Sequence, residues 1–175
     1  MKQDNLNVPY FVIPVPDHQT LKSKILSAID SMGVHSYREG DQSIYNTDWH
    51  IGGDVHRPYI DLMQPVYEQS RHVLSDYFNT PIYTENTWYQ QYDTGDFHGW
   101  HTHHAFYNGI YYVELSDDAA RTTVNLGYET DIEVEEGTVM LLPGGILHRS
   151  SPNLSDMRKT VVVFNMAITY NKRYE

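Results

Sequence analysis

Hydrophobic positions in the N-terminal third of the chain follow first a strand pattern and then a helical one. Residues 10–15 (YFVIPV) form an apolar run that predicts a first strand. Residues 21–32 carry Leu, Ile, Ile and Met at roughly helical spacing and stop before Gly33, which predicts one amphipathic helix. Residues 34–56 are rich in Gly, Asp and Ser without a sustained period, so we expect a loop there with at most one short strand at residues 43–45.

The pattern changes from helical to strand-like near residue 80. Residues 65–78 share a helical stripe, with Pro65 tolerated in the first turn, and residues 58–63 fit a separate helical turn. Beyond this point, apolar runs separated by Gly, Asp, Asn and Pro predict strands at residues 83–92, 106–115, 122–126, 138–142 and 160–168. Helices followed by closely spaced strands favour an α+β, mostly β fold, namely a two-sheet jelly roll flanked by N-terminal helices.

The length of the chain predicts one domain spanning residues 1–175, with a helical part over about 1–80 and a jelly-roll core over about 81–170. An aromatic content of 13%, including 15 Tyr, also favours strands. We expect a cytoplasmic protein, because no apolar run approaches the length of a membrane span and the N-terminus lacks the apolar core of a signal peptide. An oligomer is possible, but the oligomeric state cannot be read from the sequence.

Charge and cysteine content narrow the partners and the chemistry. A formal charge of −11 with no cluster of Lys and Arg argues against nucleic acid and anionic membranes, which leaves a small molecule or a peptide as substrate. Without cysteine the chain has no thiolate ligand, so any metal must be held by imidazole and oxygen.

The densest group of candidate ligands is in residues 95–115 (GDFHGWHTHHAFYNGIYYVEL). In an extended chain, side chains two residues apart point to the same face, so His101 and His103 are expected to converge while His104 points away. His98 lies in a Gly-rich turn, where its direction cannot be predicted from parity.

A third ligand is expected from His148, which follows a buried strand and a Pro-Gly-Gly turn. Three ligands on one face leave coordination positions open, as catalysis at a metal requires. A lone histidine beside aromatic strands usually only makes hydrogen bonds in a core or lies on a surface. We apply that interpretation to the histidines without such geometry, which are His18, His35, His50, His56 and His72.

Ten positions after His148, Arg158 begins a β-branched strand. Arg158 and Thr160 share parity, so if Val161 and Val163 fill the other face, both would point into the pocket. A guanidinium there binds a carboxylate through two parallel hydrogen bonds, and the hydroxyl adds a third. The alternative is a surface arginine beside an edge strand.

Over residues 88–168, about half the chain, these elements resemble the prolyl-hydroxylase-like branch of the iron(II)- and 2-oxoglutarate-dependent oxygenases. The resemblance is one of order and spacing, carried by the segments WYQQYDTGDFHGW, HTH, GIYYVEL and EEGTVMLLP followed by His148 and Arg158. It implies a double-stranded β-helix of the cupin-like kind, Fe(II) bound by His101 and His148, 2-oxoglutarate as co-substrate, and O2. The roles that it implies for binding 2-oxoglutarate fall on Arg158, Thr160, Tyr92 and Tyr112.

The sequence departs from this family at one ligand. Where most members have Asp or Glu, this chain has His103, so the metal face becomes three imidazoles. A carboxylate offsets part of the charge of iron, and its loss makes the metal more electrophilic. Asp93 or Asp96, from the preceding turn, are the alternative carboxylate donors.

Three functions stay open at this point. The first is an Fe(II)/2-oxoglutarate-dependent dioxygenase that hydroxylates a C–H bond of an unknown substrate. The second is a cupin-like, three-histidine dioxygenase or hydrolase that does not use 2-oxoglutarate. The third is a non-catalytic β-sandwich, a binding or virion-associated module with a structural metal.

Overall fold

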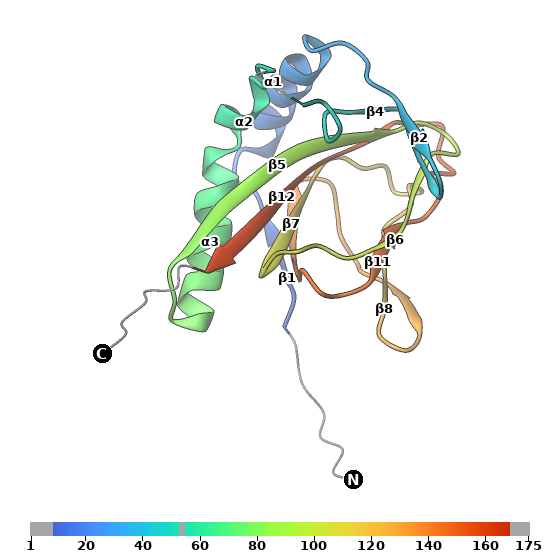
Figure 1. The fold of residues 1–175 in the computed structure, drawn as a ribbon. Helices are drawn as coiled ribbons and strands as arrows, with labels where there is room; N and C mark the ends of the chain where they lie inside the picture. The colour runs from blue at the N-terminus through green and yellow to red at the C-terminus, as the bar shows by residue number, and fades with distance from the viewer. Residues whose placement is uncertain (1–8, 53–54, 169–175) are drawn as a thin grey trace.

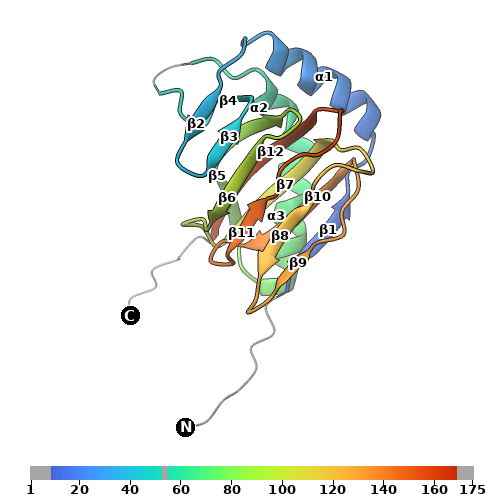
Figure 2. The ribbon, with the colours of Figure 1, turned by 90° about the vertical axis from the view of Figure 1, so that its right-hand side faces the viewer.

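Two antiparallel sheets lie face to face, and helices cover the outer face of one of them (Figures 1 and 2). This arrangement is seen in a computed structural model that describes residues 9–52 and 55–168. Within these residues, each sheet has six strands. The mostly β, jelly-roll fold predicted from the alternating runs is therefore confirmed.

The first sheet has the spatial order β1-β10-β7-β12-β5-β4. Its strands are β1 (Phe11–Pro14), β10 (Thr138–Pro143), β7 (Tyr107–Glu114), β12 (Lys159–Ile168), β5 (Ile82–Tyr92) and β4 (Asn46–Thr47). The second sheet has the order β2-β3-β6-β11-β8-β9. Its strands are β2 (Tyr37–Glu39), β3 (Gln42–Ile44), β6 (Phe97–His101), β11 (His148–Ser150), β8 (Thr122–Asn125) and β9 (Glu129–Asp131). Segments far apart in the sequence thus become neighbours, and β11 lies between β6 and β8.

The helices of the described part of the chain are α1 (His18–Asp30), α2 (Tyr59–Leu62) and α3 (Gln64–Phe78). They pack on the face of the first sheet that is turned away from the second sheet (Figure 1). Strand β12 consequently has two buried faces. Val162 and Phe164 belong to the core under the helices, whereas Val161 and Val163 belong to the core between the sheets.

The predicted helices and the longer strands are present with shifts of a few residues at their ends. The short strand expected at residues 43–45 corresponds to β3, but the prediction of a loop over the rest of residues 34–56 is wrong in part, because β2 and β4 also form there. Side chains at the end of β4 and directly after it anchor this region. The Thr47 hydroxyl donates to the Tyr89 carbonyl at 2.6 Å, and the buried Asp48 carboxylate accepts from the Tyr89 N–H at 2.9 Å and from Arg57 Nε at 2.8 Å. Such contacts between residues far apart in the sequence leave no periodic pattern in the segment itself.

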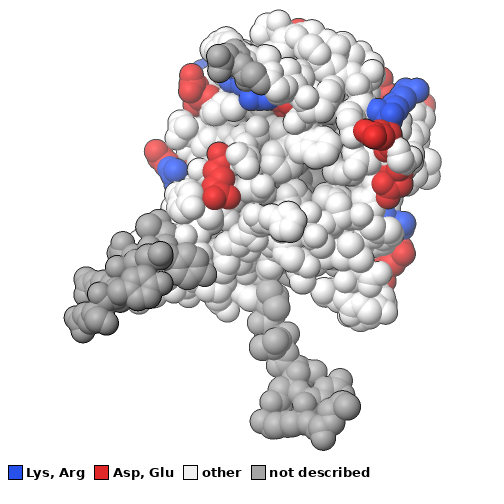
Figure 3. Space-filling view, in the orientation of Figure 1, with Lys and Arg blue, Asp and Glu red and all other residues white. Residues whose placement is uncertain are grey.

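In the described ranges, no helix has the length and apolar character that a membrane crossing would require. Figure 3 shows one face of the molecule, on which Lys and Arg are scattered near the edge and side chains without charge occupy the middle. This face therefore carries no broad basic patch of the kind that binds phosphate backbones.

Candidate metal centre

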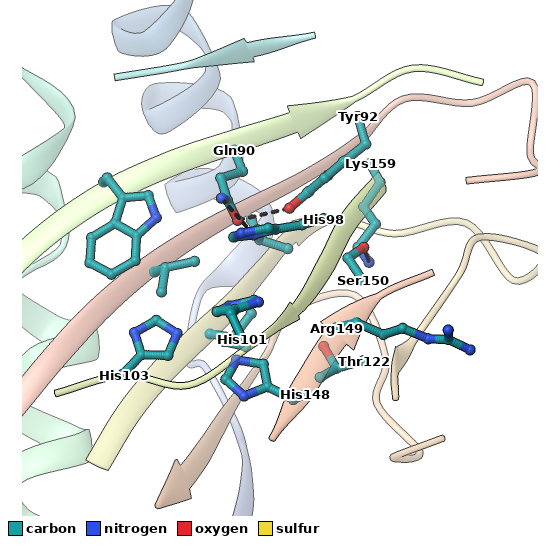
Figure 4. Close-up of a pocket in the computed structure, with 14 residues that line it drawn as sticks. Gln90, Tyr92, His98, His101, His103, Thr122, His148, Arg149, Ser150 and Lys159 are labelled. Carbon is teal, nitrogen blue, oxygen red and sulfur yellow. Dashed lines mark hydrogen bonds between the residues drawn. The ribbon is translucent and has the colours of Figure 1, made fainter. Parts of the chain in front are cut away.

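Three imidazoles from two separate segments meet between the sheets (Figure 4). His101 ends β6 and His148 begins β11, and the two residues are direct partners across this antiparallel pair. His103 follows two residues after His101, beyond the end of the strand. One nitrogen from each of the three rings lies within 4.8 Å of the others. The structure thus brings together the three side chains that the sequence pattern selected.

Gly144 allows the loop that carries His103 to approach the end of β10. The His103 N–H donates to the Gly144 carbonyl at 2.8 Å. A Cβ on Gly144 would lie 2.2 Å from the carbonyl oxygen of Ala105, closer than real Cβ atoms approach. The position of His103 therefore depends on a residue without a side chain at Gly144.

We expect Gly144→Ala to destabilise the fold by about 1–3 kcal/mol and to weaken metal binding, because the ligand loop must move away from the new methyl group. Gly145→Ala is the matched control, since a Cβ at Gly145 meets no heavy atom within 4 Å. Urea unfolding and a metal titration on both variants check this. Equal stability of the two variants would contradict the role of the close approach.

Hydrogen bonds set the same tautomer in all three rings. The Nδ1 atoms of His101 and His148 each lie 2.8 Å from a backbone carbonyl, those of Gly99 and Ile146. His103 Nδ1 lies 3.0 Å from the side-chain oxygen of Asn165. Because these partners only accept, each Nδ1 carries the proton and each Nε2 keeps its lone pair. The Nε2 atoms of His103 and His148 are buried and have no hydrogen-bond partner in the described structure.

Burial keeps these rings neutral. It lowers the pKa of His103 to about 4 and that of His148 to about 3, with a further contribution from the neighbouring imidazoles. Burial also lowers the pKa of His101. Neutral imidazoles with inward lone pairs are the form that binds a metal, and a set of nitrogen donors suits a divalent first-row ion. The residues present therefore fit a metal centre.

His98 also faces this region, which the sequence pattern could not predict. Its ring stacks on that of His101 with centroids 3.9 Å apart and an angle of 12° between planes. Its Nδ1 lies 3.2 Å from the amide nitrogen of Gln90, whose oxygen accepts from the Tyr92 hydroxyl at 2.8 Å (Figure 4). His98 is not part of the converging group of ligand atoms, and burial lowers its pKa to about 3.

No carboxylate joins the three rings among the described residues. The buried side chain of Asp96, one of the two alternative donors, accepts from the Ser43 hydroxyl at 2.6 Å and from the Asp93 N–H at 3.0 Å. This carboxylate therefore organises the turn before β6 instead of reaching the imidazoles.

The prediction that Arg158 and Thr160 point into the pocket is wrong. Both bind the Glu114 carboxylate, with Arg158 Nε at 2.9 Å, and neither lines the cavity beside the histidines. The residue between them, Lys159, lines it instead, together with Val161. The alternation of side chains along this segment is as predicted, but the pocket lies on the opposite face from the one expected. Sequence pattern cannot distinguish the faces here, because both faces of β12 are buried.

Lys159 is a buried cation without an acidic partner among the described residues. It is 1% exposed, and its Nζ donates to the Ala120 carbonyl at 2.7 Å and to the Ser150 hydroxyl at 3.0 Å. Burial, and then repulsion by Arg121, lowers the pKa of Lys159 to about 7. A buried unpaired ammonium is costly, so an anionic ligand beside it would be strongly stabilised.

Of the two tyrosines expected to bind the co-substrate, one lines this cavity. Tyr92 lines it, and Tyr112 lies behind it with its hydroxyl 2.7 Å from that of Thr122, a lining residue. The cavity is narrow, with a volume of about 30 Å³, which corresponds to roughly two water molecules. Neighbouring side chains must therefore move apart to admit a larger ligand.

A wider cleft of about 800 Å³ also reaches the imidazoles. It shares His101 and His103 with the narrow cavity, and Trp49 and Arg57 lie along its wall. Trp49 is half exposed, whereas Arg57 is held by the buried Asp48. The narrow cavity, which contains the cation, and the wider opening thus adjoin along His101 and His103.

The chain is similar to known proteins in structure but not detectably in sequence. No protein-family model and no curated protein sequence matches the chain. Among solved structures, an oxidoreductase of the 2-oxoglutarate/iron(II) oxygenase family from Burkholderia pseudomallei superposes with a TM-score of 0.71 at 14% identity, over 90% of this chain and 85% of its own. The chain has the fold of the 2-oxoglutarate/iron(II) oxygenases. The resemblance inferred from the motifs is therefore confirmed at the level of the fold.

Two further structures of this fold were solved with 2-oxoglutarate. The viral collagen prolyl hydroxylase of Paramecium bursaria Chlorella virus 1 has a TM-score of 0.66 at 13% identity, with 91% of this chain and 96% of that chain covered. HygX from Streptomyces hygroscopicus, which holds nickel and 2-oxoglutarate, has a TM-score of 0.66 at 11% identity, with 92% and 83% covered.

Proposed function

We propose that this protein is an Fe(II)- and 2-oxoglutarate-dependent oxygenase that hydroxylates a small-molecule or peptide substrate. The observation that carries the proposal is the convergence of three imidazoles whose protonated nitrogens are all engaged elsewhere, in a fold shared with oxygenases of this type. His101, His103 and His148 would hold the iron. When bound, iron supplies the activation of O2 that couples conversion of 2-oxoglutarate into succinate and CO2 to hydroxylation of the substrate.

Lys159 is the residue that we assign to the distal carboxylate of 2-oxoglutarate, in place of Arg158. Its ammonium is buried in the same cavity as the imidazoles, and the hydroxyl of Ser150 and the Tyr92 ring lie next to it. A carboxylate there would make a charge-assisted hydrogen bond in a site shielded from water. The dicarboxylate would thereby be oriented with its other end toward the imidazoles.

The wider cleft is the side from which we propose that the substrate approaches. Trp88 contributes to both spaces and stacks on His103, with centroids 5.7 Å apart and planes at 16°. Its indole would shield the reacting centre from water, which protects a reactive oxidant from side reactions.

Anaerobic titration tests the proposal. We expect one equivalent of 2-oxoglutarate to bind the Fe(II)-loaded protein and to produce a visible charge-transfer band. Omission of Fe(II) or of 2-oxoglutarate should abolish the band. Admission of air should then release succinate. Removal of Fe(II) with a chelator should lower the melting temperature, because an ion that binds only the native state stabilises that state.

The three-imidazole donor set also favours a second function, a cupin-like dioxygenase whose substrate binds the metal directly. The same titration separates the two. Tight Fe(II) binding without any affinity for 2-oxoglutarate would refute the first function and support the second.

A further inference from the structure

His103 is held by a different kind of contact from the other two imidazoles. His101 and His148 each bond through Nδ1 to a carbonyl two residues earlier in the same segment. The Nδ1 partner of His103 is instead a side chain, that of Asn165, which lies 62 positions away on β12. The orientation of His103 therefore depends on a tertiary contact that a single substitution can remove.

A carboxamide has an accepting end and a donating end of nearly the same shape. With its oxygen toward His103, as here at 3.0 Å, the proton is on Nδ1, and the buried Nε2, which has no hydrogen-bond partner in the described structure, keeps its lone pair. With the NH2 group turned toward His103, Nδ1 would have to accept, and the proton would move to Nε2. An N–H at Nε2 excludes that atom as a metal ligand.

We propose that Asn165 is a positioning residue that selects the metal-binding tautomer of His103. The inference rests on the proposed metal centre. His103 occupies the position at which most members of the oxygenase family have a carboxylate ligand. A carboxylate has no tautomers, whereas an imidazole binds a metal through Nε2 only when its proton is on Nδ1. Asn165 selects this tautomer by presenting its oxygen to Nδ1, while the indole of Trp88 lies nearly parallel to the imidazole of His103.

The neighbouring strand offers a matched control. Asn108 on β7 is the direct partner of Asn165 across the β7–β12 ladder. It is completely buried, and neither polar atom of its side chain has a hydrogen-bond partner in the described structure. Asn108→Leu removes the same chemical group one strand away without removing the contact to His103.

The test compares Asn165→Leu, Asn165→Asp and Asn108→Leu with the parent protein. Affinity for Co(II) is measured by competition with a chelator, and the tautomer of His103 in the metal-free protein is read from its ring ¹⁵N shifts. We expect Asn165→Leu to weaken Co(II) binding by about 10–100-fold and to give mixed tautomers. Asn165→Asp keeps an acceptor, so it should retain Nδ1–H and at least the parent affinity, and Asn108→Leu should remain within about twofold of the parent.

Each outcome decides the proposal. Parent-like affinity and tautomer in Asn165→Leu would overturn it while leaving the metal centre intact, and so would loss of Co(II) binding in Asn165→Asp. A parent protein without affinity for Co(II) would argue against the proposed function, yet the tautomer measurement would still decide the role of Asn165. If Asn165→Leu does not fold, the Asp variant and the parent spectrum supply the answer.

Discussion

Replacing His148 with alanine is expected to abolish metal binding and succinate release. The substitution removes one of three ligands and leaves two rings that cannot enclose an ion from one face. We expect the affinity for Fe(II) or Ni(II) to fall by at least about a thousandfold, which corresponds to about 4 kcal/mol. A metal at a hundred times its Kd should raise the unfolding free energy of the parent by about 2.7 kcal/mol, and that of the variant by almost nothing.

Thermal unfolding with and without metal measures this difference. For a chain of this length, about 2.7 kcal/mol corresponds to a shift of roughly 5–11 °C in the melting temperature. His72→Ala is the control, because His72 is exposed on α3 and contacts only Asp76 among charged groups of the described chain. His148→Gln, with a side chain closer in size, separates loss of a ligand from loss of packing. An unchanged metal-dependent shift in both His148 variants would refute the centre.

The general architecture was predictable because the long strands are amphipathic or continuously apolar over many residues. The run of residues 138–142 and the alternation after residue 83 each identify a strand without help from distant contacts. The short strands at residues 43–45 and 122–126 were predicted and correspond to β3 and β8, but β4 and β11, with two and three residues, were not predictable. Their positions are fixed by partners elsewhere, as the contacts of Asp48 show.

The metal candidates were predictable because their evidence is local. His101 and His103 are two residues apart, and His148 follows a turn that returns the chain to the sheet. Their supporting contacts were not local. Asn165 reaches His103 across 62 positions, and the direction of His98 depends on its pairing with Gln42 on β3. No periodicity connects such residues in the sequence.

The face of β12 is the clearest failure of the sequence argument. Alternation along residues 159–164 is visible, but both sets of side chains are apolar or buried, since helices cover one face and the second sheet covers the other. Hydrophobicity identifies the inner face of a strand only when the other face is exposed to solvent. Without that contrast, an arginine and a lysine next to each other cannot be assigned to the pocket by pattern alone.

Lys159→Met is therefore expected to separate binding of 2-oxoglutarate from binding of metal. The variant loses the buried cation of the cavity while His101, His103 and His148 stay in place. We expect its affinity for 2-oxoglutarate to fall by about a hundredfold, or about 2.7 kcal/mol, with metal affinity unchanged. Arg158→Gln changes the residue just before β12, which binds Glu114 and does not line the cavity, and it should change the affinity by less than about threefold once the fold is shown to be intact.

The pH dependence of binding gives this prediction a second readout. Burial and Arg121 lower the pKa of Lys159 to about 7, so the free protein holds a full charge there only below that pH. Above it, binding of the dicarboxylate must first restore a proton, and the affinity for 2-oxoglutarate should fall by up to about tenfold per pH unit. Lys159→Arg should remove this decline because a guanidinium stays charged. Calorimetry of the metal-loaded parent and Lys159→Arg proteins between about pH 6 and pH 9, a range that includes the pKa of Lys159, measures both effects. A parent affinity that is flat across this range, or a loss in Arg158→Gln that equals the loss in Lys159→Met, would show that the carboxylate is bound elsewhere.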